Sequence, residues 1–382
     1  MIYTAGSLFC GIGGFCYGFE QAGFKTIWAN DIDEEAIATY RINFPTVNAI
    51  REDIRLLNES EYLLPPVDVL HAGFPCQSFS QAGNRLGFKD ERGLLFFEII
   101  KFIKRFGRDK PKVLVFENSP FLTMGNGGAW FDTIKREIQR AGYWFNDLNA
   151  VVIDARKNAG LPQRRERLFM VATSRDHFDY NLFREPIPRR DVTPLVNLLD
   201  IGKVHDQDYF LSENNKYGAW IAGEAKKHDD VRLFQLRKVV LRPQPYGMCP
   251  TLTANMGAGG HNVPFLLDNG RLRKLTEREC LRLQGFPEDF KWPELARGSK
   301  YKLPELARGP KYKLIGNAVS PPVARLLALL PCLAPDLSAK NLPERNGGRT
   351  QCRRAWPAQR SRLMRAACEE KSPNRIHYTK VL

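Results

Sequence analysis

Hydrophobic residues recur in two different patterns along the first 174 positions of the chain. Four short apolar runs have the length of buried strands: IYTAGSLF, TIWANDI, VDVLHAGF and KVLVFENS. Between them lie stretches with helical spacing, such as residues 130–142, where apolar residues recur every three or four positions before a glycine. Strands that alternate with helices favour a parallel sheet covered by helices. We therefore predict an α/β fold with a Rossmann-like, doubly wound sheet over residues 1–174.

Two more strand-like runs, YWFNDLNAVVI and RLFMVATS, follow without an intervening helix, and the long loop ARKNAGLPQRRE lies between them. We expect them to form a hairpin-like pair at the edge of the sheet. After about residue 175 the alternation stops, and prolines and mixed charges dominate to roughly residue 250. This change predicts a second, smaller domain over residues 175–270.

Helical patterns return after residue 270. Thr276 and Glu279 have the spacing of a capping box, and a last helix is expected from Pro322 to about Leu330. We assign residues 271–334 to a return segment, of which 312–330 packs on the first domain. Residues 335–382 carry eleven basic and four acidic residues without clear periodicity. We expect this basic tail to be disordered.

A tandem repeat lies inside the return segment. PELARGSKYKL at 293–303 is followed at once by PELARGPKYKL at 304–314, and the two copies differ at one position. Two copies are too few for a solenoid. We expect the extra copy to loop out on the surface.

The charge and the cysteines narrow the functional classes. A net charge of +15 suits a polyanionic partner such as nucleic acid, although a membrane surface or plain solubility fits it as well. No apolar run approaches the roughly 20 residues that span a bilayer, so we expect a soluble protein. Eight dispersed cysteines without a CxxC pair suggest reduced thiols in a cytosol. The six histidines fall singly, so we expect no metal site.

The turn after the first strand, CGIGGF, can let a nucleotide-like ligand approach the backbone at a helix N-terminus. Cys16 stands where the dinucleotide fingerprint would have its third glycine, which departs from the pattern of nicotinamide enzymes. Asp31 and Asp33 end the second strand, where a carboxylate can bind ribose hydroxyls. Asp33 fits a helix N-cap better. Asp53, after the third run, is placed to reach an adenine amino group.

A thiol and a carboxylic acid follow two further strands. Cys76 comes just after VDVLHAGF, and Glu117 ends the next strand of the sheet. The carboxyl ends of neighbouring parallel strands share one edge, so we expect both groups to face one cleft. Methylation of cytosine at C5 requires such a pair: a thiolate adds to C6 while an acid assists at N3, which makes C5 nucleophilic.

Together the motifs resemble those of the DNA (cytosine-5) methyltransferase family. The resemblance covers residues 7 to about 324 and rests on ordered blocks, namely SLFCGIGGF, NDID, EDI, GFPCQSFS, RGLLFFE, ENS, PQRRER, LTERECLRLQGFP and YKLIGNAVSPPVA. It implies a catalytic domain of the kind found in S-adenosylmethionine-dependent methyltransferases, with residues 175–270 as the target-recognition domain.

The resemblance also implies individual roles. S-adenosyl-L-methionine would be bound by Phe9, Gly11, Gly13, Asp31, Asp53 and Asn317. The catalytic residues would be Cys76, Glu117, Gln163, Arg165 and Arg167. We expect Arg165 to bind the cytosine O2 or to favour the thiolate of Cys76 by its charge.

The implied reaction is methylation of a cytosine flipped out of a specific double-stranded DNA sequence, through a covalent bond from Cys76 to C6. This activity would fit a monomer in a bacterial cytosol, associated with the nucleoid. A cognate restriction endonuclease could act on the same DNA site. Three alternatives stay open: an RNA cytosine-5 methyltransferase, a DNA-binding relative impaired by the 293–314 duplication, and a nicotinamide-dependent enzyme. The long recognition segment favours DNA over RNA, and the glycine spacing opposes the nicotinamide enzyme.

Overall fold

The alternation of strands and helices builds the large sheet that was predicted. The computed structural model describes residues 2–61, 63–75, 91–181, 183, 185, 191–203, 205–212, 216–228, 230–237, 240–257, 262–293, 306–330 and 333. Three features of the sequence lie outside these residues: the candidate nucleophile Cys76, the first copy of the repeat after Pro293, and the basic tail 335–382.

The large sheet has eight strands in the order β3-β2-β1-β4-β5-β8-β6, with β7 also paired to β8. The first five strands are parallel, and β8 runs antiparallel to β5, β6 and β7. The α/β, doubly wound fold class is therefore confirmed, and β7 and β8 form the expected antiparallel pair. The connection between them was predicted as a loop but contains a short helix, Ala155–Ala159, which Asp154 caps and Gly160 ends. The strands are β1 Thr4–Leu8, β2 Lys25–Asp31, β3 Asn48–Arg51, β4 Val69–Gly73, β5 Val113–Asn118, β6 Tyr143–Trp144, β7 Ala150–Asp154 and β8 Glu166–Ser174.

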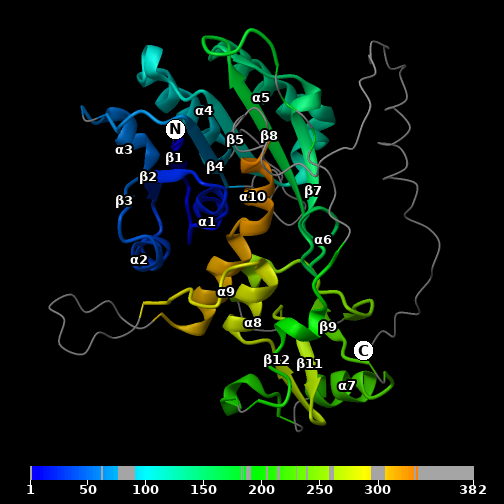
Figure 1. The fold of residues 1–382 in the computed structure, drawn as a ribbon. Coiled ribbons are helices and arrows are strands. Elements are labelled where there is room, and N and C mark those ends of the chain that lie inside the picture. The colour runs from blue at the N-terminus through cyan, green and yellow to red at the C-terminus, as the bar shows by residue number, and fades with distance from the viewer. Residues whose placement is uncertain are drawn as a thin grey trace, which may run out of the picture.

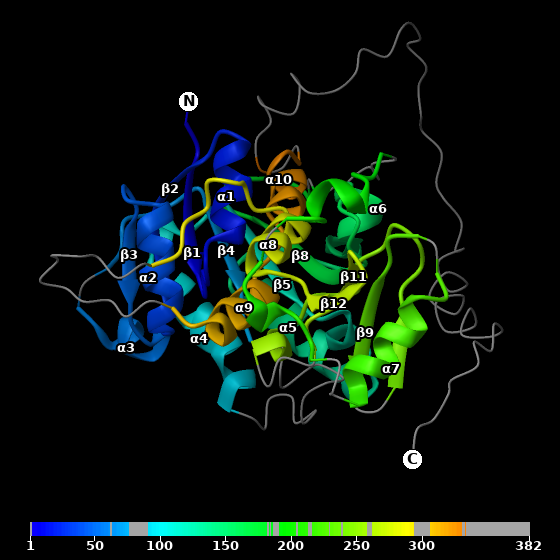
Figure 2. The same ribbon diagram turned by 90° about the horizontal axis from the view of Figure 1, so that it is seen from below.

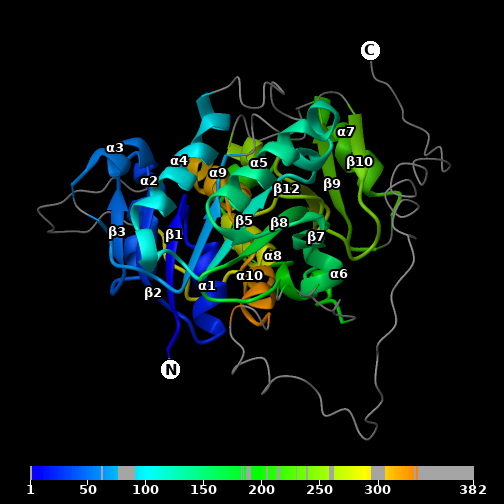
Figure 3. The same cartoon turned by 90° about the horizontal axis from the view of Figure 1, so that it is seen from above.

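Helices cover both faces of this sheet, and each face has its own apolar core. α4 and α5 pack on one face, while α1, α6 and the late helix α10 pack on the other (Figure 3). The helices of this part are α1 Gly14–Gln21, α2 Glu34–Asn43, α3 Ile54–Glu59, α4 Glu91–Arg105, α5 Ala129–Arg140 and α6 Ala155–Ala159, with 3₁₀ turns η2 Gly107–Asp109, η3 Pro120–Thr123, η4 Gly125–Gly128 and η5 Asp147–Asn149.

A second sheet forms where the sequence pattern changes. Its four strands are all antiparallel, in the order β10-β9-β11-β12, and α7 lies against them (Figure 2). Asn269 and Gly270 both have positive φ and make the tight turn between β11 and β12. This sheet extends past residue 270, because β12 pairs with β11 along its whole length. Its elements are η6 Leu195–Leu198, η7 Gln207–Tyr209, α7 Lys216–Ala225, β9 Leu233–Arg237, β10 Val240–Pro243, η8 Ala254–Gly257, β11 Phe265–Asp268 and β12 Arg271–Lys274.

The chain then returns to the large sheet through α8 Glu277–Gln284, α9 Arg308–Asn317 and α10 Pro321–Ala328. Thr276 and Glu279 form the capping box that the sequence predicted at the start of α8. α10 packs on α1 although the two helices lie at opposite ends of the chain (Figure 1). Gly14 and Gly18 permit this approach, since a Cβ atom would lie 2.0 Å from the Val319 carbonyl oxygen or 2.4 Å from that of Pro321.

The second copy of the repeat is part of the core. Its residues Leu306, Tyr312 and Leu314 are buried among the apolar side chains that join α8, α9 and the second sheet. The hydroxyl of Tyr312 donates to the Leu275 carbonyl oxygen at 2.5 Å. This copy continues directly into Ile315 and Asn317 at the end of α9, and the chain then enters α10.

Deleting residues 294–304 leaves one complete copy of the repeat, which begins with Pro293 directly after Trp292. We expect an unchanged or higher thermal unfolding midpoint, because the contacts of α9 survive and the connection before it becomes shorter. Deleting residues 304–314 instead leaves the first copy, in which Ser299 takes the place of Pro310 at the third position of α9. We expect this variant to have a similar unfolding midpoint. Deletion of 293–314 is the control that should prevent folding. Loss of folding in the first variant would show that both copies are structural.

His71 is a buried imidazole in the middle of β4. Its ring stacks on Phe15, with 4.8 Å between ring centroids, and lies 4.9 Å from that of Phe19. Neither ring nitrogen has a hydrogen-bond partner among the described residues. Burial lowers the pKa of His71 from 6.5 to about 3. The side chain is therefore neutral in the folded protein at any ordinary pH.

His71 should make the protein less stable in acid. Between the unfolded pKa of 6.5 and the folded pKa of about 3, the unfolded chain binds a proton that the folded chain does not, so stability is lost as pH falls below 6.5. At pH 5 the loss should be about 2 kcal/mol. Urea unfolding at pH 7.5 and pH 5 should show a smaller drop in His71→Val than in the parent. Equal drops in the two proteins would contradict the assignment.

Candidate active site at the carboxyl edge of the large sheet

The candidate residues gather where the parallel strands end. β1 leads into the glycine turn, β2 ends at Asp31, and β5 carries Glu117 next to its last residue. Gly73, the last residue of β4, pairs with Glu117 in the sheet, and the Asn118 amide donates to the Phe74 carbonyl oxygen at 3.2 Å. The chain therefore leaves β4 toward Cys76 directly beside Glu117.

The glycine turn is tied to the end of β2 by the Asp31 carboxylate. One oxygen accepts the amide of Gly11 at 2.8 Å, and the other accepts the amide of Asp33 at 2.9 Å. Burial raises the pKa of Asp31 above its ordinary value, and these amide hydrogen bonds limit the rise. Phe9 and Gly11 both have a φ of 53°, and nothing lies within 4 Å of the place where Gly11 would carry a Cβ atom. The turn thus presents bare backbone to open space.

Two other acidic residues at this edge cap helices. Asp33 accepts the amides of Glu35 and Ala36 at the start of α2, at 3.0 and 3.1 Å, which agrees with the N-cap interpretation. Asp53 accepts the amide of Arg55 at the start of α3 and forms an ion pair with that side chain at 2.7 Å. These hydrogen bonds with Arg55 lower the pKa of Asp53.

Asn317 and Gly13 complete the set predicted around a cofactor. Asn317 is the last residue of α9 and is exposed. Gly13 precedes α1 with a φ of 90°, and a Cβ atom there would lie 2.3 Å from the ring of Phe44. The structure thus places Phe9, Gly11 and Gly13 on one turn, with Asp31 hydrogen-bonded to it from the end of β2 and Asp53 just after the neighbouring strand β3.

Glu117 is a largely buried acid with one close positive charge. Its carboxylate lies 3.1 Å from Nε of Arg167, and its side chain is only 12% exposed. Burial raises the pKa of Glu117, while the charges of Arg167 and Arg165 oppose the rise. A carboxyl group in this setting can hold a proton at higher pH than a solvated glutamate and can donate it to a bound base.

Arg165 and Gln163 bind backbone rather than an open cleft. The Arg165 guanidinium donates to the carbonyl oxygens of Leu252 at 2.6 Å, Ala318 at 2.8 Å and Gly316 at 3.1 Å. The Gln163 amide donates to the Leu283 carbonyl oxygen at 2.9 Å and to the Gln284 side chain at 2.8 Å. These two residues therefore hold the loop before β8, the segment after β10 and the return segment together.

Residues 165 and 167 lie two positions apart, so they share one side of the extended chain, whereas Arg164 and Glu166 are exposed. The two-residue spacing of these arginines in the sequence indicates that both side chains point inward. It does not reveal that Arg167 reaches Glu117 while Arg165 turns to backbone carbonyls. Sequence reasoning also missed Lys313, whose ammonium lies 2.9 Å from the Asp33 carboxylate.

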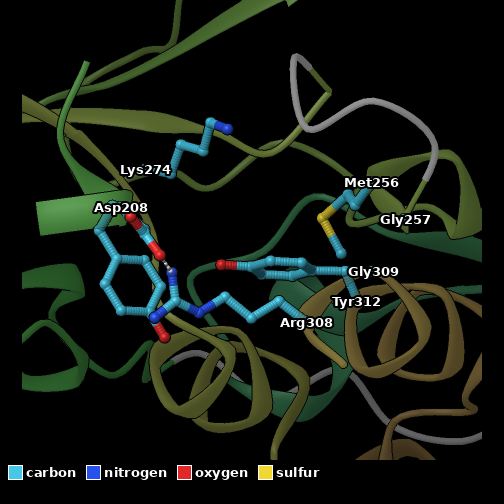
Figure 4. A pocket seen from close by; sticks show the side chains of 8 residues that line it. Asp208, Met256, Gly257, Lys274, Arg308, Gly309 and Tyr312 are labelled. Carbon is cyan, nitrogen blue, oxygen red and sulfur yellow. Dashed lines mark ion pairs between the residues drawn. The ribbon is translucent and has the colours of Figure 1, made fainter. Parts of the chain in front are cut away.

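A hollow of about 270 Å³ lies between the second sheet and the start of α9 (Figure 4). The Arg308 guanidinium stacks over the ring of Tyr209 at 4.1 Å and forms ion pairs with Asp206 at 2.7 Å and Asp208 at 3.5 Å. Because the charges on this wall compensate one another, the hollow mainly shows how α9 is fixed to the second sheet.

The described residues contain neither a metal-binding cluster nor a membrane-spanning helix. No group of histidine, cysteine, aspartate and glutamate side chains there is arranged to hold a metal ion. None of the helices in that part of the chain is long and apolar enough to span a membrane.

Comparisons with known proteins agree on one family. The family model described as C-5 cytosine-specific DNA methylase matches residues 3–329. The chain is 38% identical over 324 residues to the Type II methyltransferase M.Bsp6I of Bacillus sp. (strain RFL6), which covers 84% of this chain and 96% of that relative. It is 35% identical over 293 residues to the Type II methyltransferase M1.ScrFI of Lactococcus lactis subsp. cremoris, covering 76% of this chain and 71% of the relative.

Solved structures support the fold. The methyltransferase EhMeth of Entamoeba histolytica superposes with a TM-score of 0.59 at 18% identity, and the match covers 88% of this chain and 99% of that one. At this identity the likeness concerns the architecture alone.

Arg165→Met should destabilise the protein strongly. The substitution leaves three buried carbonyl oxygens without their charged donor, which should cost roughly 3 kcal/mol or more. Arg164→Met is the matched control, because the neighbouring side chain is exposed and its loss should change the free energy of unfolding by less than about 0.5 kcal/mol. Urea unfolding of both variants measures the difference. Similar values for the two would remove Arg165 as a structural anchor.

Proposed function

This chain belongs to the family of C-5 cytosine-specific DNA methylases, and on that basis we propose that it transfers a methyl group from S-adenosylmethionine to C5 of a cytosine in duplex DNA. The observation that carries the proposal is the buried Glu117 beside Arg167, on the strand next to the one that leads into Cys76. A protonated acid and a thiol at one edge of a sheet are the two groups that the reaction needs.

The residues of the glycine turn fit the cofactor. Gly11 leaves open space above bare backbone at the N-terminal side of α1, and the Asp31 carboxylate stands beside it. Such a turn suits a nucleoside, with Asp31 accepting hydrogen bonds from the ribose hydroxyls. When bound, S-adenosylmethionine supplies an electrophilic methyl group. We propose Phe9, Gly11, Gly13, Asp31, Asp53 and Asn317 as the residues that hold it.

Cys76 and Glu117 act together on the target base. The Cys76 sulfur forms a bond to C6 while Glu117 donates a proton to N3, so the electron pair of the C5–C6 double bond becomes available at C5. After C5 takes the methyl group, solvent takes up the C5 proton, the C5–C6 double bond forms again and the C6–S bond breaks to release the thiolate. N3 returns its proton to Glu117, which restores the acid.

Arg167 is the guanidinium placed to support this step. It contacts Glu117 directly, whereas the Arg165 guanidinium donates to three carbonyl oxygens. We therefore propose that Arg167 orients the acid and contacts the cytosine O2. Arg165 and Gln163 then act by holding the surrounding segments in place.

The target cytosine must leave the helix stack, because a thiolate attacks C6 from above the plane of the ring. We propose residues 175–270, with the adjoining strand β12, as the part that recognises the DNA sequence. The relatives are named Type II methyltransferases. We propose that this chain acts in a restriction–modification system, with a cognate endonuclease for the same DNA site, in a bacterial cytoplasm.

Purified protein incubated with methyl-labelled S-adenosylmethionine and mixed-sequence duplex DNA should produce 5-methylcytosine. Folded RNA of equal length should take up no label. An absence of transfer to any duplex would refute the proposed activity, and transfer to RNA alone would favour an RNA methyltransferase of the same fold.

Cys76→Ser should lower turnover roughly a thousandfold or more while DNA binding is retained, because the serine hydroxyl is a far weaker nucleophile. In a duplex with 5-fluorocytosine at the target position, the base carries fluorine at C5 and has no C5 proton to lose. The reaction should therefore stop at a covalent complex with the parent protein, and Cys76→Ser should form no such complex. Cys368→Ser, outside the family motifs, is the control that should retain both properties. Normal methylation by Cys76→Ser would remove Cys76 as the nucleophile.

A further inference from the structure

Lys313 connects α9 to the turn that ends β2. Its ammonium lies 2.9 Å from one oxygen of the Asp33 carboxylate, across 280 positions of sequence. The other oxygen of Asp33 caps α2 through the amides of Glu35 and Ala36. Lys313 therefore holds a residue whose position also fixes the start of α2.

The same contact leads on to the glycine turn. The backbone amide of Asp33 donates to Asp31, and the other oxygen of Asp31 accepts the amide of Gly11. Lys313, Asp33, Asp31 and Gly11 thus form one connected series of ionic and hydrogen-bonded contacts. It begins on α9 and ends at the open backbone that we assign to the cofactor.

The charges explain why a lysine stands there. Asp31 and Asp33 lie two residues apart and repel each other when both are ionised. Hydrogen bonding to Asp33 raises the pKa of Lys313 against the opposing effect of burial, and the charges of Asp33, Glu35 and Asp31 add to the rise. Burial alone would raise the pKa of Asp33, but the hydrogen bond from Lys313 and the helix amides outweigh it.

Folding stability is a poor explanation for this pair. The Lys313 side chain is 48% exposed and that of Asp33 27%, and ion pairs with such exposure contribute little to the free energy of unfolding. The ion pair instead fixes the position of the turn that carries Asp31.

We propose that Lys313 is a positioning residue for the cofactor, which holds the Asp31–Asp33 turn in the conformation that receives the ribose. The inference rests on the proposed function and deepens it. Lys313 acts through Asp33 and does not contact the reacting atoms.

The duplicated segment supplies a matched control. Lys302 occupies the same place in the first copy, within the identical sequence KYKL. Because α9 is formed by the second copy, the structure assigns the contact to Lys313. Lys302→Gln should therefore leave the affinity for the cofactor unchanged.

Calorimetric titration of the full chain with S-adenosylhomocysteine tests the proposal without DNA. Lys313→Gln should weaken binding about fivefold, the upper end expected for an exposed ion pair, and Lys313→Arg should restore it. Asp33→Asn keeps a residue that caps helices well, so it should lose about as much as Lys313→Gln. The double variant should lose no more than either single one.

Kinetics and salt distinguish positioning from a general structural effect. Lys313→Gln should raise KM for S-adenosylmethionine while kcat at saturation and the thermal unfolding midpoint stay unchanged. Rising ionic strength should bring the cofactor affinity of the parent down toward that of Lys313→Gln, because salt screens the pair.

Three results would overturn the proposal. The first is equal cofactor affinity of Lys313→Gln and the parent, and the second is an equal loss of affinity in Lys302→Gln and Lys313→Gln. The third is a loss of affinity that appears only when Lys302 and Lys313 are both replaced by Gln. A parent chain that binds S-adenosylhomocysteine but methylates no DNA would refute the proposed function instead. In that case the binding experiments would still decide the role of Lys313.

Discussion

The buried guanidinium of Arg165 is the interaction on which the rest of the structure depends. It donates to the carbonyl oxygens of Leu252, Gly316 and Ala318, which belong to two separate parts of the chain, the segment after β10 and the end of α9. Arg165 also stands immediately before β8, and the pairing of β8 with β5 brings Arg167 to Glu117. One side chain thereby fixes the second sheet, the return segment and the surroundings of the acid relative to one another.

α9 extends that arrangement from the second sheet to the cofactor edge. Arg308 at its start is held by Tyr209 and by two carboxylates, and Lys313 on a later turn contacts Asp33. The second copy of the repeat continues without interruption into Ile315 and the last turn of the helix. The apolar Leu314 is buried among the side chains that join α8, α9 and the second sheet.

Several local features could be predicted because they depend on neighbours in the sequence. The capping box of Thr276 and Glu279 and the N-cap at Asp33 both formed as expected. The alternating strands and helices predicted the doubly wound sheet for the same reason, since residue spacing dictates which face of an element is apolar. The motif blocks also predicted Gln163, Arg165 and Arg167 near one site. They did not separate the arginine that meets Glu117 from the one that binds backbone.

By itself, the sequence determined the elements, their order and the chemical groups available, including the thiol at Cys76 and the acid at Glu117. Those properties follow from residue type and short-range spacing. Only the tertiary structure decided that Arg167 meets Glu117 and that Lys313 meets Asp33. Strand order and the packing of α9 set both pairs, and residues so far apart in the chain meet only after the large sheet and the return segment have assembled.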